Sequence, residues 1–128
     1  MKEYKVQIEV CKFLRYMQDK YQFRYFHVPN EGNRTLKNKF LLVKMGLKSG
    51  CPDLIIEFPG GRIVYIELKS KTGRLSDNQI LWYENSAKLK TPHYILKGDF
   101  SKIKDELYSI IRRYGKFIET QLKREVVK

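Results

Sequence analysis

Two carboxylates, Asp53 and Glu67, and one ammonium group, Lys69, flank a predicted β-hairpin in the middle of the chain. Two apolar runs surround a Pro-Gly-Gly turn at residues 59–61, which is typical of antiparallel strands joined by a short loop. Side chains alternate along a strand, so Glu67 and Lys69 share one face. If the residues on either side of the turn pair, Asp53 falls opposite Glu67. The spacing therefore predicts three charged groups on one face of an apolar hairpin.

Two kinds of chemistry fit this arrangement. Buried charges are costly unless they are paired or hold a metal ion. Carboxylate oxygens suit a hard divalent cation such as Mg²⁺ or Mn²⁺. The alternative is a structural Asp–Lys or Glu–Lys bridge on a solvated sheet face. The three residues alone leave both interpretations open.

Composition restricts the class of protein. The chain has 128 residues, 42% of them hydrophobic, which predicts one folded domain over 1–128 rather than a disordered chain. Lys and Arg number 26 against 14 Asp and Glu, for a net charge of +12. This excess favours a polyanionic partner, with nucleic acid first, although solubility or an anionic membrane surface would also use it.

Targeting and cysteine signals are sparse. The sequence shows no membrane-spanning stretch and no signal peptide at its start, so we expect a cytoplasmic protein without a membrane partner. The two cysteines, Cys11 and Cys51, lack the spacing of a zinc site. We expect both to be reduced thiols.

Periodicity and turn residues predict an alternation of helices and strands around the hairpin. The predicted elements are helices at 3–20, 35–45 and 76–89, strands at 21–28 and 93–96, and a last helix that contains residues 103–111. Ser76 is the predicted N-cap of the third helix, and Ser101 or Asp99 that of the last one. Residues 115–128 form either a C-terminal helix or a tail.

Several polar residues outside the hairpin are candidates for the same site. Glu9 lies at the edge of the apolar face of the first helix, where a glutamate is usually a solvated flank. Asn30 and Arg34 lie in a polar turn that either connects two elements or touches phosphate. Gln79 follows a basic loop and could point at the carboxylates. Both histidines, His27 and His93, are expected to be structural.

The order of these residues resembles the PD-(D/E)xK nuclease superfamily, and within it the VRR-NUC branch. Pro52-Asp53 and Glu67-x-Lys69 stand for the superfamily signature, which is weak alone because short charged spacings arise by chance. The surrounding residues make the resemblance stronger. They are Pro29-Asn30-Glu31-Gly32-x-Arg34, Gly50-x-Pro52-Asp53-Leu54, Ile66-Glu67-Leu68-Lys69 and Gly73-x-Leu75-Ser76-x-x-Gln79-x-x-Trp82. Glu31 departs from the glycine often seen after the asparagine, and the basic tail has no counterpart.

The resemblance implies an α/β, restriction-endonuclease-like PD-(D/E)xK fold with a mixed central β-sheet flanked by helices. It also implies a Mg²⁺- or Mn²⁺-dependent phosphodiesterase acting on DNA. Asp53, Glu67 and the Leu68 carbonyl would be metal ligands, and Glu9 would touch a metal directly or through water. Lys69 would orient or deprotonate the attacking water, and Gln79 would position that water or a phosphate oxygen.

Small stand-alone members of this family resemble homodimeric enzymes that cleave four-way (Holliday) junctions, so branched DNA is the expected substrate. The alternatives are a flap- or single-strand-specific nuclease and a non-catalytic, basic nucleic-acid-binding protein. The dimer contact is expected at 35–45 or at Phe117, Ile118 and Leu122. The candidates for the DNA-binding surface are Asn30, Arg34, Lys37, Lys39, Lys71 and Arg74.

Overall fold

A mixed four-stranded sheet forms the centre of the protein, which we describe from a computed structural model. The structure describes residues 3–29, 36–46 and 48–118. The strand order is β2-β3-β4-β5, in which β2, β3 and β4 are antiparallel neighbours and β5 is parallel to β4. The strands of this sheet are β2 (Arg24–His27), β3 (Leu54–Phe58), β4 (Arg62–Lys69) and β5 (His93–Lys97). The predicted mixed sheet is confirmed.

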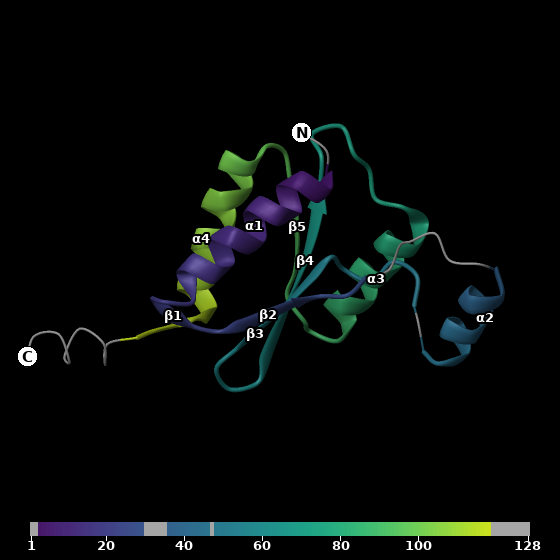
Figure 1. The fold of residues 1–128 in the computed structure, drawn as a ribbon. Coiled ribbons are helices and arrows are strands. Elements are labelled where there is room, and N and C mark those ends of the chain that lie inside the picture. Colours follow the sequence, from purple (N-terminus) through teal and green to yellow (C-terminus); the bar gives the residue numbers. More distant parts are fainter. Residues whose placement is uncertain (1–2, 30–35, 47, 119–128) are drawn as a thin grey trace, which may run out of the picture.

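Four helices surround this sheet. They are α1 (Glu3–Met17), α2 (Leu36–Lys44), α3 (Asp77–Lys88) and α4 (Phe100–Tyr114). Figure 1 shows α1 and α4 together on one side of β4 and α3 on the other, with α2 standing away from the sheet. Each helix of the described chain is too short or too polar to span a bilayer.

The core lies between α1, α4 and one face of the sheet. Apolar side chains of α1 and α4 recur every three or four residues, and this spacing gives each helix one buried stripe. The buried residues are Val6, Val10, Leu14 and Met17 from α1, Leu54, Ile56, Phe58, Val64, Ile66, Leu68 and Leu96 from the sheet, and Ile103, Leu107, Ile110 and Ile111 from α4. The opposite face of β4, which carries Glu67 and Lys69, faces α3.

The segment predicted as one strand over 21–28 is two strands with different partners. β1 (Tyr21–Gln22) pairs with β6 (Lys116–Phe117), whereas β2 pairs with β3. The chain changes partner at Phe23, whose ring packs 5.9 Å from that of Phe58. The short β6 occupies the start of the segment predicted as a helix or a tail, and residues 119–128, including Leu122, lie outside the described part.

The helix boundaries follow the predicted caps. The Ser76 hydroxyl accepts a hydrogen bond from the Gln79 N–H, and the Gln79 side chain accepts one from the Ser76 N–H, so a capping box begins α3. Asp99, rather than Ser101, caps α4 by accepting from the Lys102 N–H. These bonds satisfy N–H groups that a helix start leaves without an internal partner.

The loop before β3 is docked on the first turn of α3. Gly50 has φ +84°, and a Cβ added there would lie 2.4 Å from the Asn78 carbonyl oxygen. The Asn78 side chain also donates a hydrogen bond to the Ser49 hydroxyl at 2.9 Å. This close contact fixes the chain that enters β3 relative to Gln79.

We expect Gly50→Ala to lower the free energy of unfolding. The left-handed backbone alone costs an L-residue roughly 1–2 kcal/mol, and the methyl group must also displace the Asn78 backbone. Gly60→Ala is the matched control, because Gly60 has φ +83° and nothing within 4 Å of its Cβ position. Urea denaturation of both variants gives the difference, and equal losses would contradict the close packing at Gly50.

Candidate active site

Asp53 lies where β3 begins, beside the end of β4. The register pairs Leu54 with Ile66, so its continuation places Asp53 opposite Glu67, as the sequence predicts. Oδ2 of Asp53 accepts a hydrogen bond from the Leu68 N–H at 2.7 Å. In an antiparallel strand the N–H and C=O of one residue point the same way. The Leu68 carbonyl therefore faces the Asp53 side as well.

Glu67 is a buried carboxylate held by α3. Glu67 is 1% exposed, and its Oε1 accepts a hydrogen bond from Nε2 of Gln79 at 3.1 Å. The other end of the Gln79 amide accepts from the Ser76 N–H at 2.8 Å. The capping box thus orients the Gln79 amide so that its NH₂ group reaches Glu67. The hydrogen bonds at the start of α3 therefore fix the position of Gln79 beside Glu67.

The thiol of Cys51 lies in the negative field of the two carboxylates. Burial raises the pKa of its thiol, and the negative charges of Glu67 and Asp53 raise that pKa further. Both effects disfavour a thiolate. The same concentration of negative charge attracts a cation to the two carboxylates.

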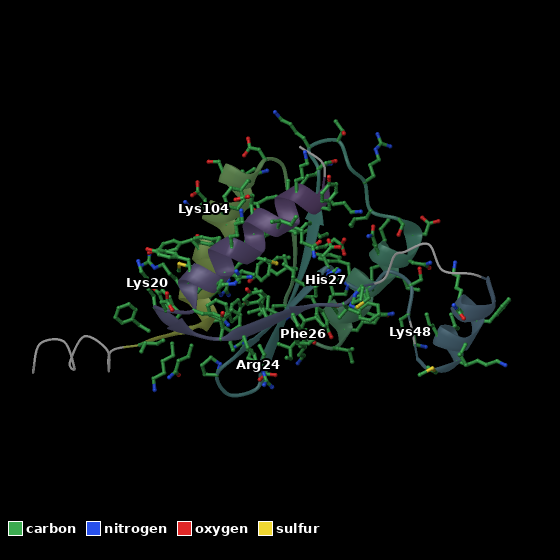
Figure 2. All side chains as sticks on the ribbon, viewed as in Figure 1. Lys20, Arg24, Phe26, His27, Lys48 and Lys104 are labelled. Atoms are coloured by element: carbon green, nitrogen blue, oxygen red, sulfur yellow. The ribbon has the colours of Figure 1, made fainter. Side chains whose placement is uncertain are left out.

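An open cavity of about 430 Å³ lies in front of Asp53, and we call it the acidic cleft. Its wall is formed by Tyr4 and Gln7 of α1, His27 and Val28 at the end of β2, residues 49–51 and 53, and Ser76 and Gln79. His27 lies at the end of β2, between α1 and α3 (Figure 2). Its Nδ1 is 2.7 Å from the Asp53 carbonyl oxygen. Since a carbonyl only accepts, Nδ1 carries the proton.

Lys69 shares the face of Glu67 but lines a different hollow. It is half-buried and lines this hollow together with Arg74 and Lys97. The structure thus brings Asp53, Glu67 and Gln79 together directly, and it places Lys69 two residues further along β4.

Glu9 lies apart from these residues. It is half-exposed and forms an ion pair with Lys12 at 3.2 Å, and it is absent from the wall of the acidic cleft within the described residues. Tyr4 and Gln7, nearer the start of α1, line the cleft instead. Sequence reasoning missed Tyr4, Gln7 and His27. The signal for Gln7 is its position beside the buried stripe of α1, but the sequence does not say which end of α1 approaches β3.

The predicted DNA-binding residues are spread over two regions. Lys39 is exposed on α2, and Lys71 and Arg74 are exposed in the loop between β4 and α3. The backbone of Lys37 belongs to α2, but its side chain lies outside the described set, as do Asn30 and Arg34. The structure therefore leaves the surface predicted for these three side chains undescribed.

Comparisons with known proteins agree on one family. The model of the VRR-NUC domain matches residues 6–100. The chain belongs to the VRR-NUC family. A solved structure titled "VRR_NUC domain protein" is similar with a TM-score of 0.65 and 25% identity, and the match covers 89% of this chain and 88% of that one. A second, titled "VRR_NUC domain", has a TM-score of 0.53 and 19% identity, with coverages of 84% and 94%, and supports the fold alone. A search of curated proteins finds no match.

Membership in the VRR-NUC family identifies the domain as a nuclease of the PD-(D/E)xK type, a class that generally uses divalent metals. The donor set fits such an ion, since it consists of two carboxylates and a backbone carbonyl in a negative field. In the described part of the VRR-NUC domain, no three His, Cys, Asp or Glu side chains are placed to share a metal. A bound cation would therefore combine Asp53 and Glu67 with the Leu68 carbonyl and water.

The burial of His93 makes the stability of the protein depend on pH. Burial lowers the pKa of His93 from 6.5 to about 4. Its ring contacts the rings of Tyr65 and Tyr83, and its Nδ1 is 3.2 Å from the Ser86 hydroxyl. Below pH 6.5 the unfolded chain therefore takes up a proton that the folded protein excludes. Stability should fall as the pH drops from 6.5 to about 4, and this contribution levels off below that.

Unfolding by urea at pH 7 and pH 5 measures the effect. We expect His93→Phe, which keeps an aromatic ring but removes the titration, to lose less stability between these two pH values than the wild type does. An NMR titration that places the pKa of His93 near 6.5 in the folded protein would contradict the assignment.

Proposed function

We propose that the protein is a Mg²⁺- or Mn²⁺-dependent DNA endonuclease that works as a homodimer on branched DNA such as four-way junctions. The observation that carries the catalytic part is that Asp53, which bonds to the Leu68 N–H, lies beside buried Glu67 at one end of the sheet and lines an open cleft. A carboxylate is kept in such a buried position only where something offsets the cost. Here the Gln79 amide offsets part of the cost, and a cation would offset more of it.

The chain's own residues define where the reaction takes place. A cation bound by Asp53, Glu67 and the Leu68 carbonyl would lower the pKa of a coordinated water and offset the charge on the phosphate. The Leu68 N–H and the Gln79 amide each hold one carboxylate oxygen, so both carboxylates are oriented before substrate arrives. The acidic cleft gives the scissile phosphodiester access to Asp53.

Lys69 supplies positive charge next to this centre. It follows Glu67 by two positions on the same strand face, so its ammonium can reach the phosphate that lies over the carboxylates. In this position the charged form orients the attacking water and stabilises the charge that develops on the phosphate oxygens, and only the neutral amine could deprotonate that water. Glu9 has no such placement in the structure, and a role for it would require an intervening water.

DNA is the proposed substrate because of charge. The net charge of +12 favours a polyanion. Lys39, Lys71 and Arg74 are exposed, and Arg74 lines the hollow that Lys69 also lines. A dimer would double this charge and could hold several duplex arms.

The homodimer is proposed to form through α2. Phe40, Leu41, Val43 and Met45 on and after this helix are between 53% and 75% exposed, and the described side chains of α2 contribute nothing to the core. Such a cluster is typical of an interaction surface. A second copy is the proposed occupant because two-fold pairing is the commonest closed assembly, and it would match the approximate symmetry of a four-way junction.

Replacing either carboxylate should remove activity without unfolding the protein. We expect Asp53→Asn and Glu67→Gln each to reduce cleavage at least about 10²-fold, since even residues that only support metal ligands cost 10–100-fold. Both variants should also lose Mn²⁺ affinity in calorimetry. Glu57→Gln is the control, because Glu57 pairs with Arg24 on the same sheet but away from the cleft.

The assay is a panel of junction, flap, single-strand and duplex DNA with Mg²⁺, Mn²⁺ or chelator. Faster cutting of flaps or single strands than of junctions would overturn the branched-DNA proposal in favour of a flap- or single-strand-specific nuclease. DNA binding without metal-dependent cleavage would indicate a non-catalytic binding protein. Near-normal turnover by either carboxylate variant would overturn the metal-ligand assignment.

A variant in α2 tests the proposed homodimer. Phe40→Glu places a charge in the exposed apolar face of α2 and should shift a dimer to a monomer in sedimentation velocity while the melting temperature changes little. Leu89→Glu, at an apolar residue that is 77% exposed at the end of α3, should stay dimeric. A monomeric wild type at micromolar concentration that nicks junctions no faster than flaps would refute this proposal, and the nuclease assignment would stand.

A further inference from the structure

A second hollow, of about 450 Å³, lies beside the first turn of α3, and we call it the basic hollow. Its charged wall comes from three different segments: Lys69 at the end of β4, Arg74 in the loop after it, and Lys97 at the end of β5. Its apolar floor is formed by Leu75, Ile80 and Ile95. Three cations thus surround an apolar surface.

The strand register places two of these three cations next to each other. Lys69 and Lys97 are paired positions on the parallel strands β4 and β5, and both side chains lie on the α3 face. Like charges at paired positions repel. The ion pairs of the described residues join Lys12 to Glu9, Arg24 to Glu57 and Lys102 to Glu106, so none neutralises the basic hollow. An anion bound there would relieve the repulsion.

The hollow is adjacent to the candidate active site. Ile95 on its floor is the register partner of Glu67, and Ile80 follows Gln79, which bonds to Glu67. The first turn of α3 therefore borders both the acidic cleft and the basic hollow. A chain that places one phosphate over Asp53 and Glu67 can continue past this turn into the hollow.

We infer that the basic hollow binds a nucleotide of the DNA strand next to the scissile phosphate. This inference rests on the proposed function, because it assigns a further contact to the same substrate. Arg74 and Lys97 hold the flanking phosphate, and the base or sugar covers Leu75, Ile80 and Ile95. The apolar floor distinguishes this ligand from a simple inorganic anion, which would gain nothing from it.

Methyl NMR tests the ligand directly. The probe is a 5′-phosphorylated thymidine dinucleotide, added to the Asp53→Asn variant with chelator present so that no cleavage occurs. We expect saturable shifts of the Ile80 and Ile95 methyl signals. Inorganic phosphate and an abasic analogue of the dinucleotide should produce much smaller shifts. Shifts of equal size with phosphate, or shifts confined to Val28 in the acidic cleft, would overturn the inference.

A charge variant tests the phosphate contact. Lys97→Gln should weaken DNA binding, because it removes one of the cations of the basic hollow. In the Asp53→Asn background it should lower the salt slope of DNA binding by about one, as expected for one lost phosphate contact. Lys88→Gln, which removes an exposed charge in the last turn of α3, should leave the slope nearly unchanged.

Different results would reject the basic hollow and the proposed catalysis. An unchanged salt slope in Lys97→Gln, with normal metal-dependent cleavage by the wild type, would reject the basic hollow and leave the nuclease assignment intact. Absence of cleavage in every assay, together with the predicted methyl shifts and slope, would reject the proposed catalysis and leave a nucleotide-binding hollow.

Discussion

The antiparallel pairing of β3 with β4 is the constraint on which the rest of the site depends. It brings Asp53, at the start of one strand, beside Glu67 and Leu68, near the end of the other. Beyond Leu54, the Leu68 N–H donates its hydrogen bond to the Asp53 side chain. A regular strand pair would use a backbone carbonyl as the acceptor. A slip of one residue would turn Glu67 toward the core and Ile66 toward the cleft, so the register decides both packing and chemistry.

The two faces of β4 serve opposite purposes, and this explains how a small domain holds a buried carboxylate. Val64, Ile66 and Leu68 pack against α1 and α4 in the apolar core. Glu67 points the other way, where the Gln79 amide meets it from α3. Burial of apolar surface on one face anchors the strand. The rigid strand can then carry a polar group on the other face at a fixed position.

The first turn of α3 connects the local chemistry of a helix start to the whole site. The capping box with Ser76 orients Gln79 toward Glu67, and the close approach of Gly50 fixes the loop that leads to Asp53. The same turn borders both the acidic cleft and the basic hollow. A substrate strand crossing it would meet carboxylates on one side and cations on the other, which separates the proposed cation site from the proposed phosphate contacts.

Local sequence determined the elements and much of the site, because hairpin turns, helix caps and alternation act over a few residues. The turn at 59–61 fixed the register of Asp53 with Glu67, and Ser76 with Gln79 marked the start of α3. Tertiary packing decided the rest. The split of 21–28 between two partners, the approach of Tyr4 and Gln7 to the cleft in place of Glu9, and the pairing of Lys69 with Lys97 all depend on which distant segments meet. No local pattern encodes those contacts, since they arise from burying the apolar faces of several elements at once.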